Sequence, residues 1–147
     1  MNIQMVQPHR LISRPITTED KDRVVEVATA MRKWMNDRPC VGLAHPQTDD
    51  FDPLAFFIVR NEPHLIILNP KIISHSEQIV KSLEGCMTYP GRSHEYHDRY
   101  KSITVEYDVF FSGTLAKKKK TLVGFQAIVY QHEIDHLNGI YCYDKSE

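Results

Sequence analysis

The sequence predicts an α+β fold, with antiparallel or mixed β-sheets and two helices, in a single domain of residues 1–147. Apolar residues recur at helical spacing in two segments, one towards each end of the chain. Short apolar or alternating runs, which are typical of strands, lie between these segments. A chain of 147 residues can bury a hydrophobic core of its own, so a second domain is not required.

The first helix is expected to begin after Thr17 and Thr18, which precede two acidic residues in a pattern typical of a helix start. Apolar side chains then recur at helical spacing from Val24 to Met35. We expect this helix to end before Pro39.

Two short apolar runs, residues 55–59 and residues 65–68, follow the first helix. A polar segment that contains Pro63 separates them, which predicts a hairpin-like pair of strands. Asn69-Pro70 is expected to end the second strand.

A further strand is predicted where apolar and polar residues alternate from Ile103 to Val109, and Ser112-Gly113 offers a turn after it. Its partner strand should contain Leu122 or lie just before it. We interpret the lysine run at residues 117–120 as a solvated face rather than a binding patch.

The second helix is expected from Phe125 to Leu137, with Asn138-Gly139 as its C-cap. It places His132 and His136 one turn apart on one face, close enough to share a cation, with Glu133 beside them. This His-Glu-x-x-His pattern indicates a hydrolytic metal site. Solvated histidines on a helix are the simpler alternative, and a third ligand would separate the two interpretations.

The residue types leave several candidates for the third ligand, namely Cys86, His94, His97, His45 or an acid. Cys86 stands out because it follows a predicted strand and Gly85, and a glycine lets the backbone approach a metal or a substrate closely. A buried apolar cysteine is the alternative.

The composition excludes several classes of protein. A net charge of −1 gives no electrostatic reason to expect binding to nucleic acid or to an anionic membrane. The longest apolar runs are far shorter than the roughly 20 residues that span a bilayer. Cys40, Cys86 and Cys142 are an odd number of cysteines at irregular spacing, which indicates a reducing compartment rather than a disulfide framework.

Three segments, in this order, resemble the signature motifs of the peptide deformylase family. Residues 41–47 resemble the glycine-rich segment that ends in glutamine, residues 84–88 resemble the Glu-Gly-Cys motif, and residues 131–139 resemble the His-Glu-x-x-Asp-His motif. The resemblance extends over nearly the whole chain, and it implies sheets arranged around a central helix that carries the histidines.

The resemblance implies a role for each motif. Cys86, His132 and His136 would hold one divalent metal ion and leave the fourth tetrahedral position to water. Glu133 would move the protons, and Glu84 and Asp135 would orient the imidazoles or the loop. The catalytic set also includes the Gln47 amide and the Met87 backbone N–H as donors to the developing oxyanion. The expected substrate-binding positions are Val41, Gly42, Gly85, Phe125, Ile128 and Val129, with ordinary core packing as the alternative for Ile128 and Val129.

The function implied is a metal-dependent hydrolase that removes the formyl group from formyl-methionyl peptides of nascent proteins and releases formate. Ferrous iron is the expected metal, and zinc, nickel and cobalt also suit the ligand set. A monomer is expected, in the cytoplasm of a bacterium or a virus-infected host, with an organelle as the alternative. The competing interpretations are a deformylase-like metal- or peptide-binding protein that has lost turnover, and a general metallopeptidase.

The match departs from the family pattern at several positions, of which three affect the expected site or fold. Cys40 replaces the usual first glycine and His45 replaces the second alanine, and neutral substitution is the default expectation for both. The alternatives are that Cys40 narrows the substrate channel and that His45 faces solvent or contacts substrate. The chain ends shortly after His136, so the C-terminal helix of many bacterial members is expected to be absent and ribosome association to be weak.

Overall fold

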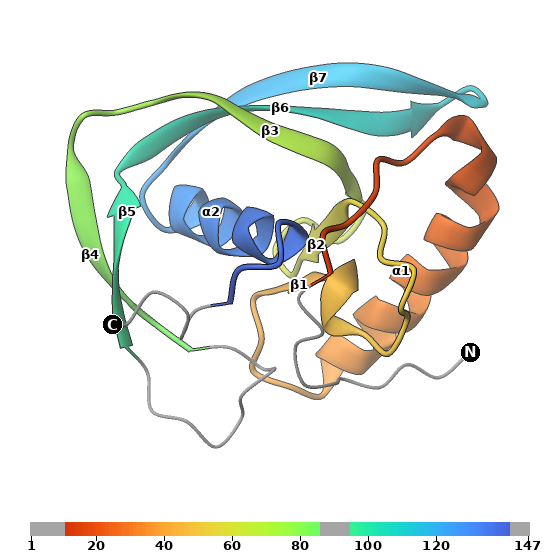
Figure 1. Ribbon diagram of the computed structural model, residues 1–147, viewed down its shortest axis with the longest axis horizontal. Coiled ribbons are helices and arrows are strands. Elements are labelled where there is room, and N and C mark those ends of the chain that lie inside the picture. The colour runs from red at the N-terminus through yellow and green to blue at the C-terminus, as the bar shows by residue number, and fades with distance from the viewer. Residues whose placement is uncertain (1–10, 86–94, 142–147) are drawn as a thin grey trace.

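The computed structural model describes residues 11–85 and 95–141, and in that part of the chain an α+β fold is formed (Figure 1). Two helices, α1 (Lys21–Asn36) and α2 (Phe125–Leu137), accompany the short 3₁₀ helices η1 (Thr18–Asp20) and η2 (His45–Gln47). The strands are β1 (Gly42–Ala44), β2 (Phe56–Val59), β3 (Ile67–His75), β4 (Ile79–Glu84), β5 (Glu95–Tyr100), β6 (Ser102–Phe111) and β7 (Thr114–Val123). Their hydrogen-bonded pairs are antiparallel, in one sheet of order β1-β2-β3-β6-β7 and a second sheet of β4 and β5.

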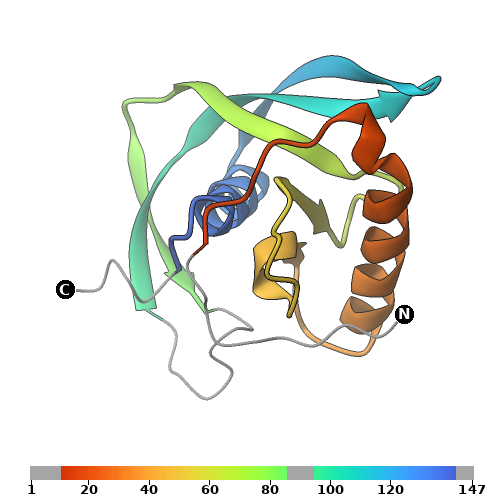
Figure 2. The same cartoon turned by 45° about the vertical axis from the view of Figure 1, so that its right-hand side comes forward.

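The helix α2 is enclosed by the two sheets, as the resemblance implied. In Figure 1 it lies below β3, β6 and β7 and beside β4 and β5, and Figure 2 shows β1 and β2 between α2 and α1. The strand β2 is buried on both faces because its alternate side chains enter two different cores. Phe57 and Val59 pack with α2, whereas Phe56 and Ile58 pack with α1.

The predicted first helix is confirmed by α1. Its entry is stabilised at Asp20, whose carboxylate accepts the backbone N–H of Thr17 at 2.9 Å. At its other end the guanidinium of Arg60 donates to the carbonyl of Met35 in the last helical turn and to that of Arg38 just beyond the helix, which fixes the chain where it leaves α1.

The strands β2 and β3 pair as predicted, but the prediction that Asn69-Pro70 ends the second strand is wrong, because β3 continues to His75. The register shifts between Leu68 and Lys71, and Asn69 takes a φ of 49°. Pro70 has no backbone N–H for a neighbouring strand, and a bulge at this point accommodates it within the sheet. The Asn69 side chain stabilises the bulge by accepting the Ile16 N–H at 2.7 Å and donating to the Ile16 carbonyl at 3.0 Å.

The second hairpin is confirmed by β6 and β7, with Ser112 and Gly113 both at positive φ in the turn. The lysine run is exposed at residues 117–119, but the expectation of a solvated face is wrong for Lys120. The Lys120 ammonium is half-buried, lies 2.9 Å from Glu62 and stands over the ring of Tyr130.

The predicted second helix is confirmed by α2, and Gly139 follows it with a φ of 77°. From there to Tyr141 the described chain forms no helix, and residues 142–147 lie outside the described residues, so the expected absence of a C-terminal helix stays a prediction. None of the helices in the described ranges has the length and apolar character that a membrane crossing requires.

Candidate metal centre and active site

Two histidines of α2 present equivalent nitrogens for a metal. The rings of His132 and His136 lie 4.5 Å apart between centroids. The Nδ1 atom of His132 lies 2.7 Å from the Glu84 carboxylate, and Nδ1 of His136 lies 3.1 Å from the carbonyl oxygen of Ile140. Because both partners are acceptors, each Nδ1 carries the proton and donates it, which leaves the Nε2 lone pair of each ring for a metal.

The carboxylate of Glu133 lies close to both imidazoles. Potential ligand atoms of His132, Glu133 and His136 all lie within 4.8 Å of one another, which fits the coordination of one cation. Glu133 is 3% exposed, so its carboxylate lies in a site from which most water is excluded. The expected third ligand Cys86 and the expected oxyanion donor Met87 lie outside the described residues.

A buried ion-pair network supports His132 from the second sheet. Glu84 ends β4, Arg99 lies opposite Val80 on β5, and both side chains are buried. Arg99 donates two hydrogen bonds to the Glu84 carboxylate, at 2.8 and 2.6 Å, and a third to Asp135 at 2.7 Å. Burial alone would raise the pKa of Glu84, but the bonds from Arg99 and His132 hold that pKa well below its usual range. Glu84 therefore remains a carboxylate that accepts the His132 proton.

This network refines the expected roles of the two acids. Glu84 contacts an imidazole, as expected, whereas Asp135 binds Arg99. Sequence patterns do not single out Arg99 as part of the site. A signal was present, since an arginine on the inward face of a strand requires acidic partners.

The edge strand β1 approaches Glu133 closely. A Cβ atom on Gly42 would lie 2.8 Å from Glu133 Oε2, so only glycine fits here without displacement of the carboxylate. Gln47, 3% exposed, follows in η2, and its Oε1 accepts the Ala44 N–H at 3.0 Å. That bond fixes which end of the amide is the oxygen and which end carries the donors.

The remaining expected substrate positions are spread over the site's surroundings. Val41 and Phe125 are exposed, and Gly85 and Ile128 are half-buried. Val129 is buried in the core cluster that includes Phe57, so its packing role is the one that the contacts support.

The two substitutions near β1 are both buried. The expectation that His45 faces solvent is wrong, because its side chain is 0% exposed and stacks on Phe56 with 5.0 Å between ring centroids. Cys40 packs with Met35 and Leu43 in the cluster around α1, and this burial raises the pKa of its thiol.

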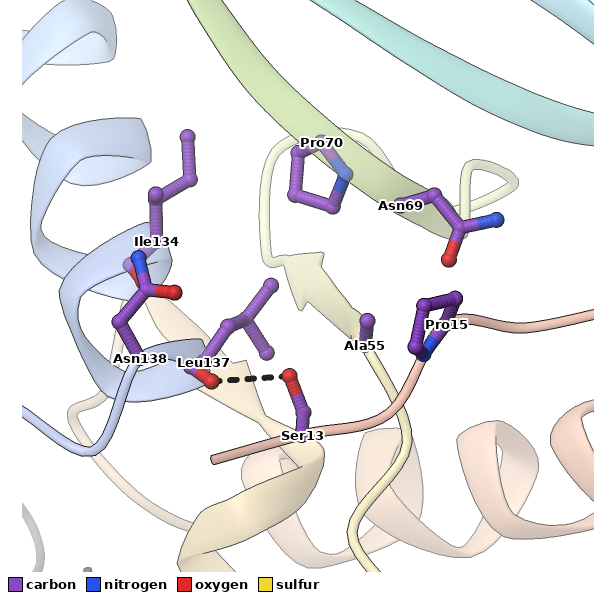
Figure 3. Close-up of a pocket in the computed structure, with 8 residues that line it drawn as sticks. All are labelled: Ser13, Pro15, Ala55, Asn69, Pro70, Ile134, Leu137 and Asn138. Carbon is purple, nitrogen blue, oxygen red and sulfur yellow. Dashed lines mark hydrogen bonds between the residues drawn. The ribbon is translucent and has the colours of Figure 1, made fainter. Parts of the chain in front are cut away.

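A separate cavity of about 220 Å³ lies beside α2 (Figure 3). Its α2 residues Ile134, Leu137 and Asn138 are, by helical spacing, on the side of the helix that faces away from the histidines. It is lined by Ser13, Pro15, Ala55, Asn69, Pro70, Ile134, Leu137 and Asn138. The Ser13 hydroxyl donates to the Leu137 carbonyl at 2.8 Å, and Asn69 is bonded to Ile16. These polar groups act within the protein, so the cavity does not share the chemistry of the metal centre.

Comparisons with known proteins agree with this geometry. Residues 6–147 match the family model of polypeptide deformylases. The peptide deformylase of Enterococcus faecalis is 36% identical over 88% of this chain and 78% of its own length. Peptide deformylase 2 of Shewanella oneidensis is 33% identical over 86% of this chain and 72% of its own length.

Solved structures give the same result. The crystal structure of the peptide deformylase from Thermotoga maritima aligns with a TM-score of 0.85 at 26% identity, over 98% of this chain and 97% of that chain. The class I type b enzyme from Acinetobacter baumannii aligns with a TM-score of 0.80 at 28% identity, over 92% of this chain and 90% of that chain. The chain therefore belongs to the peptide deformylase family.

Proposed function

We propose that this protein is a metal-dependent hydrolase that removes the N-terminal formyl group from formyl-methionyl peptides and releases formate. The observation that carries this proposal is the arrangement on α2, where potential ligand atoms of His132, His136 and the buried Glu133 carboxylate lie within 4.8 Å of one another. Membership of the peptide deformylase family supports the choice of a formylated peptide over other amides.

The proposed ligands are Cys86, His132 and His136, and the proposed physiological metal is ferrous iron, although zinc, nickel and cobalt also suit two imidazoles and a thiolate. A bound divalent metal supplies the Lewis acidity that makes water nucleophilic at neutral pH. Glu84 keeps the His132 ring in the tautomer and orientation that ligation requires.

Glu133 is proposed to act as both base and acid. Its carboxylate can accept a proton from the attacking water and then deliver that proton to the departing amine nitrogen. Its burial favours this role, because the attacking water meets few competing water molecules. Gln47 and the Met87 backbone N–H are proposed to donate to the oxygen of the formyl group as negative charge develops there.

The peptide is proposed to bind along β1. Among the described strands β1 pairs with β2 alone, so its other edge can accept an extended chain by strand addition. Gly42 brings that edge beside Glu133, which would place the first residue of the peptide at the reacting group. The proposed substrate-binding residues remain Val41, Gly42, Gly85, Phe125, Ile128 and Val129.

Formate release from formyl-Met-Ala-Ser by protein loaded anaerobically with Fe(II) tests the function. We expect turnover by the wild type, no turnover by Glu133→Gln with metal still bound, and normal turnover by the exposed control Glu77→Gln. Stoichiometric metal without formate release would instead support a binding protein, and cleavage of unformylated peptides would support a metallopeptidase. The expectations of a monomer, a cytoplasmic location and weak ribosome association stay predictions.

A further inference from the structure

A buried histidine connects the two ends of the loop between β1 and β2. His45 begins η2, and its Nδ1 atom accepts the backbone N–H of Leu54 at 2.8 Å, where the chain returns towards β2. Its ring also stacks on Phe56 of β2. A single buried side chain therefore ties the start of this loop to its end.

The second ring nitrogen lies near an acidic side chain. Because Nδ1 accepts a hydrogen bond, the proton of the neutral imidazole is on Nε2, which lies 3.2 Å from Asp50 Oδ2 without the alignment of a hydrogen bond. Asp50 forms an ion pair with Arg23 of α1. Burial is the main cause that lowers the pKa of His45 to about 4, which agrees with a neutral ring.

Hydrogen bonds at both ends of η2 surround Gln47. Its Oε1 accepts the N–H of Ala44, the residue before His45. The carbonyl of His45 accepts both the backbone N–H and the hydroxyl of Thr48, the residue after Gln47, at 3.0 and 2.8 Å. The orientation of the Gln47 amide therefore depends on the path of the backbone from residue 44 to residue 48.

We propose that His45 is a positioning residue for Gln47, whose amide it orients by fixing the loop of residues 45–54 to β2 through Leu54 and Phe56. This inference rests on the proposed role of Gln47 as an oxyanion donor. It also gives a role to the residue that departs from the family motif. Core packing alone is the competing explanation, and it predicts lower stability without a specific effect on Gln47.

The first test uses His45→Phe, which keeps an aromatic ring for Phe56 but lacks the acceptor for the Leu54 N–H. With formyl-Met-Ala-Ser as substrate, we expect kcat to fall about 10-fold while KM changes less than about twofold, since only alignment of a transition-state donor is lost. His45→Asn, whose side-chain oxygen can accept the Leu54 N–H, should recover most of the lost kcat.

Coupling to Gln47 separates positioning from packing. In a Gln47→Ala background, which itself should lose about 10²–10³ in kcat, His45→Phe should change kcat less than about twofold. An equal loss in both backgrounds would overturn the proposal, as would an unchanged kcat in a folded His45→Phe protein. Met31→Ala, a core substitution in α1, is the matched control that lowers stability while leaving kcat unchanged.

Amide hydrogen exchange gives a reading that does not depend on activity. The Ala44 N–H, which is bonded to Gln47, should exchange at least about 10-fold faster in His45→Phe and in Gln47→Ala, but not in Met31→Ala. Unchanged exchange in His45→Phe would overturn the proposal. If the wild type released no formate while this exchange pattern held, the proposed function would fail and the positioning role of His45 would stand.

Discussion

Gly42 and Glu133 are in such close contact that a single methyl group on Gly42 would lie 2.8 Å from Glu133 Oε2. Contacts below 3 Å with a carbon atom require the neighbour to move, and the neighbour here is the proposed proton carrier. We predict that Gly42→Ala lowers kcat for formate release about 10²-fold, because a displacement of about 1 Å at a catalytic group has an effect of that size. Steady-state assays on protein with verified metal content provide the measurement.

The control for this prediction is Gly113→Ala in the β6–β7 turn. Gly113 has a φ of 77° and open space around its Cα, so alanine there strains the backbone far from the site. Stability should fall by about 1 kcal/mol with kcat unchanged. Activity of Gly42→Ala within twofold of the wild type would contradict the close-contact explanation.

Arg99 provides a second prediction. It is 4% exposed and pairs with both Glu84 and Asp135, so Arg99→Met would leave the buried Glu84 carboxylate and the half-buried Asp135 carboxylate without this cation. Loss of one partner of a buried ion pair costs about 3–5 kcal/mol, and loss of support behind a metal ligand typically weakens metal binding about 10–100-fold. Denaturant unfolding and competition with a chelator measure the two effects.

The same hairpin offers a matched control. Lys81 and Asp98 form an ion pair at 2.7 Å on the exposed face of β4 and β5. Lys81→Met should change stability by less than about 1 kcal/mol and leave metal affinity unaltered, because exposed pairs contribute little. Equal effects of the Arg99 and Lys81 substitutions would show that burial of the network has no importance.

Most of the fold could be predicted because the patterns are local. The period of the apolar residues gave α1 and α2, and the alternation from Ile103 gave β6. The predicted end of β3 at Asn69-Pro70 is too early, because proline normally ends a strand. In the structure, hydrogen bonds between the Asn69 side chain and Ile16 stabilise a bulge there, and the strand continues. No local pattern reveals a partner 53 residues away.

The site was predictable where it depends on one helix. The spacing of His132, Glu133 and His136 requires only helical geometry, which the structure bears out. Arg99 and Glu84 meet only because β4 and β5 pair, and the register of two strands cannot be read from either strand alone. Likewise, the burial of His45 depends on Phe56 and Leu54, which a motif comparison does not consider.

Lys120 gives a third prediction, because it differs from its neighbours in the lysine run. Its ammonium contacts Glu62, which also accepts the Tyr130 hydroxyl at 2.6 Å. We expect Lys120→Met to lower the free energy of unfolding by about 1–2 kcal/mol, because the half-buried Glu62 carboxylate loses its cation. Lys118→Met, at an exposed position, should change it by less than about 0.5 kcal/mol. Similar free energies of unfolding for the two variants in urea would mean that Lys120 contributes no more than the exposed lysines beside it.

The buried imidazole of His45 predicts how stability depends on pH. Burial is the main cause that lowers its pKa from 6.5 to about 4, with Arg23 acting in the same direction and Asp50 and Asp52 opposing it. Between pH 6.5 and pH 4 the unfolded chain therefore binds a proton at this residue that the folded protein does not, so this contribution destabilises the fold as pH falls.

The size of this effect is the difference in the free energy of unfolding between wild type and His45→Phe. Proton uptake by the metal-site histidines occurs in both proteins and cancels in this difference. From pH 7 to pH 5 the stability of the wild type relative to the variant should fall by roughly 2 kcal/mol, because the unfolded histidine is mostly protonated at pH 5 and the folded one is not. Urea unfolding of the metal-loaded proteins at both pH values measures it. A difference that stays constant with pH would mean that His45 takes up its proton in the folded state, which its hydrogen bond from Leu54 opposes.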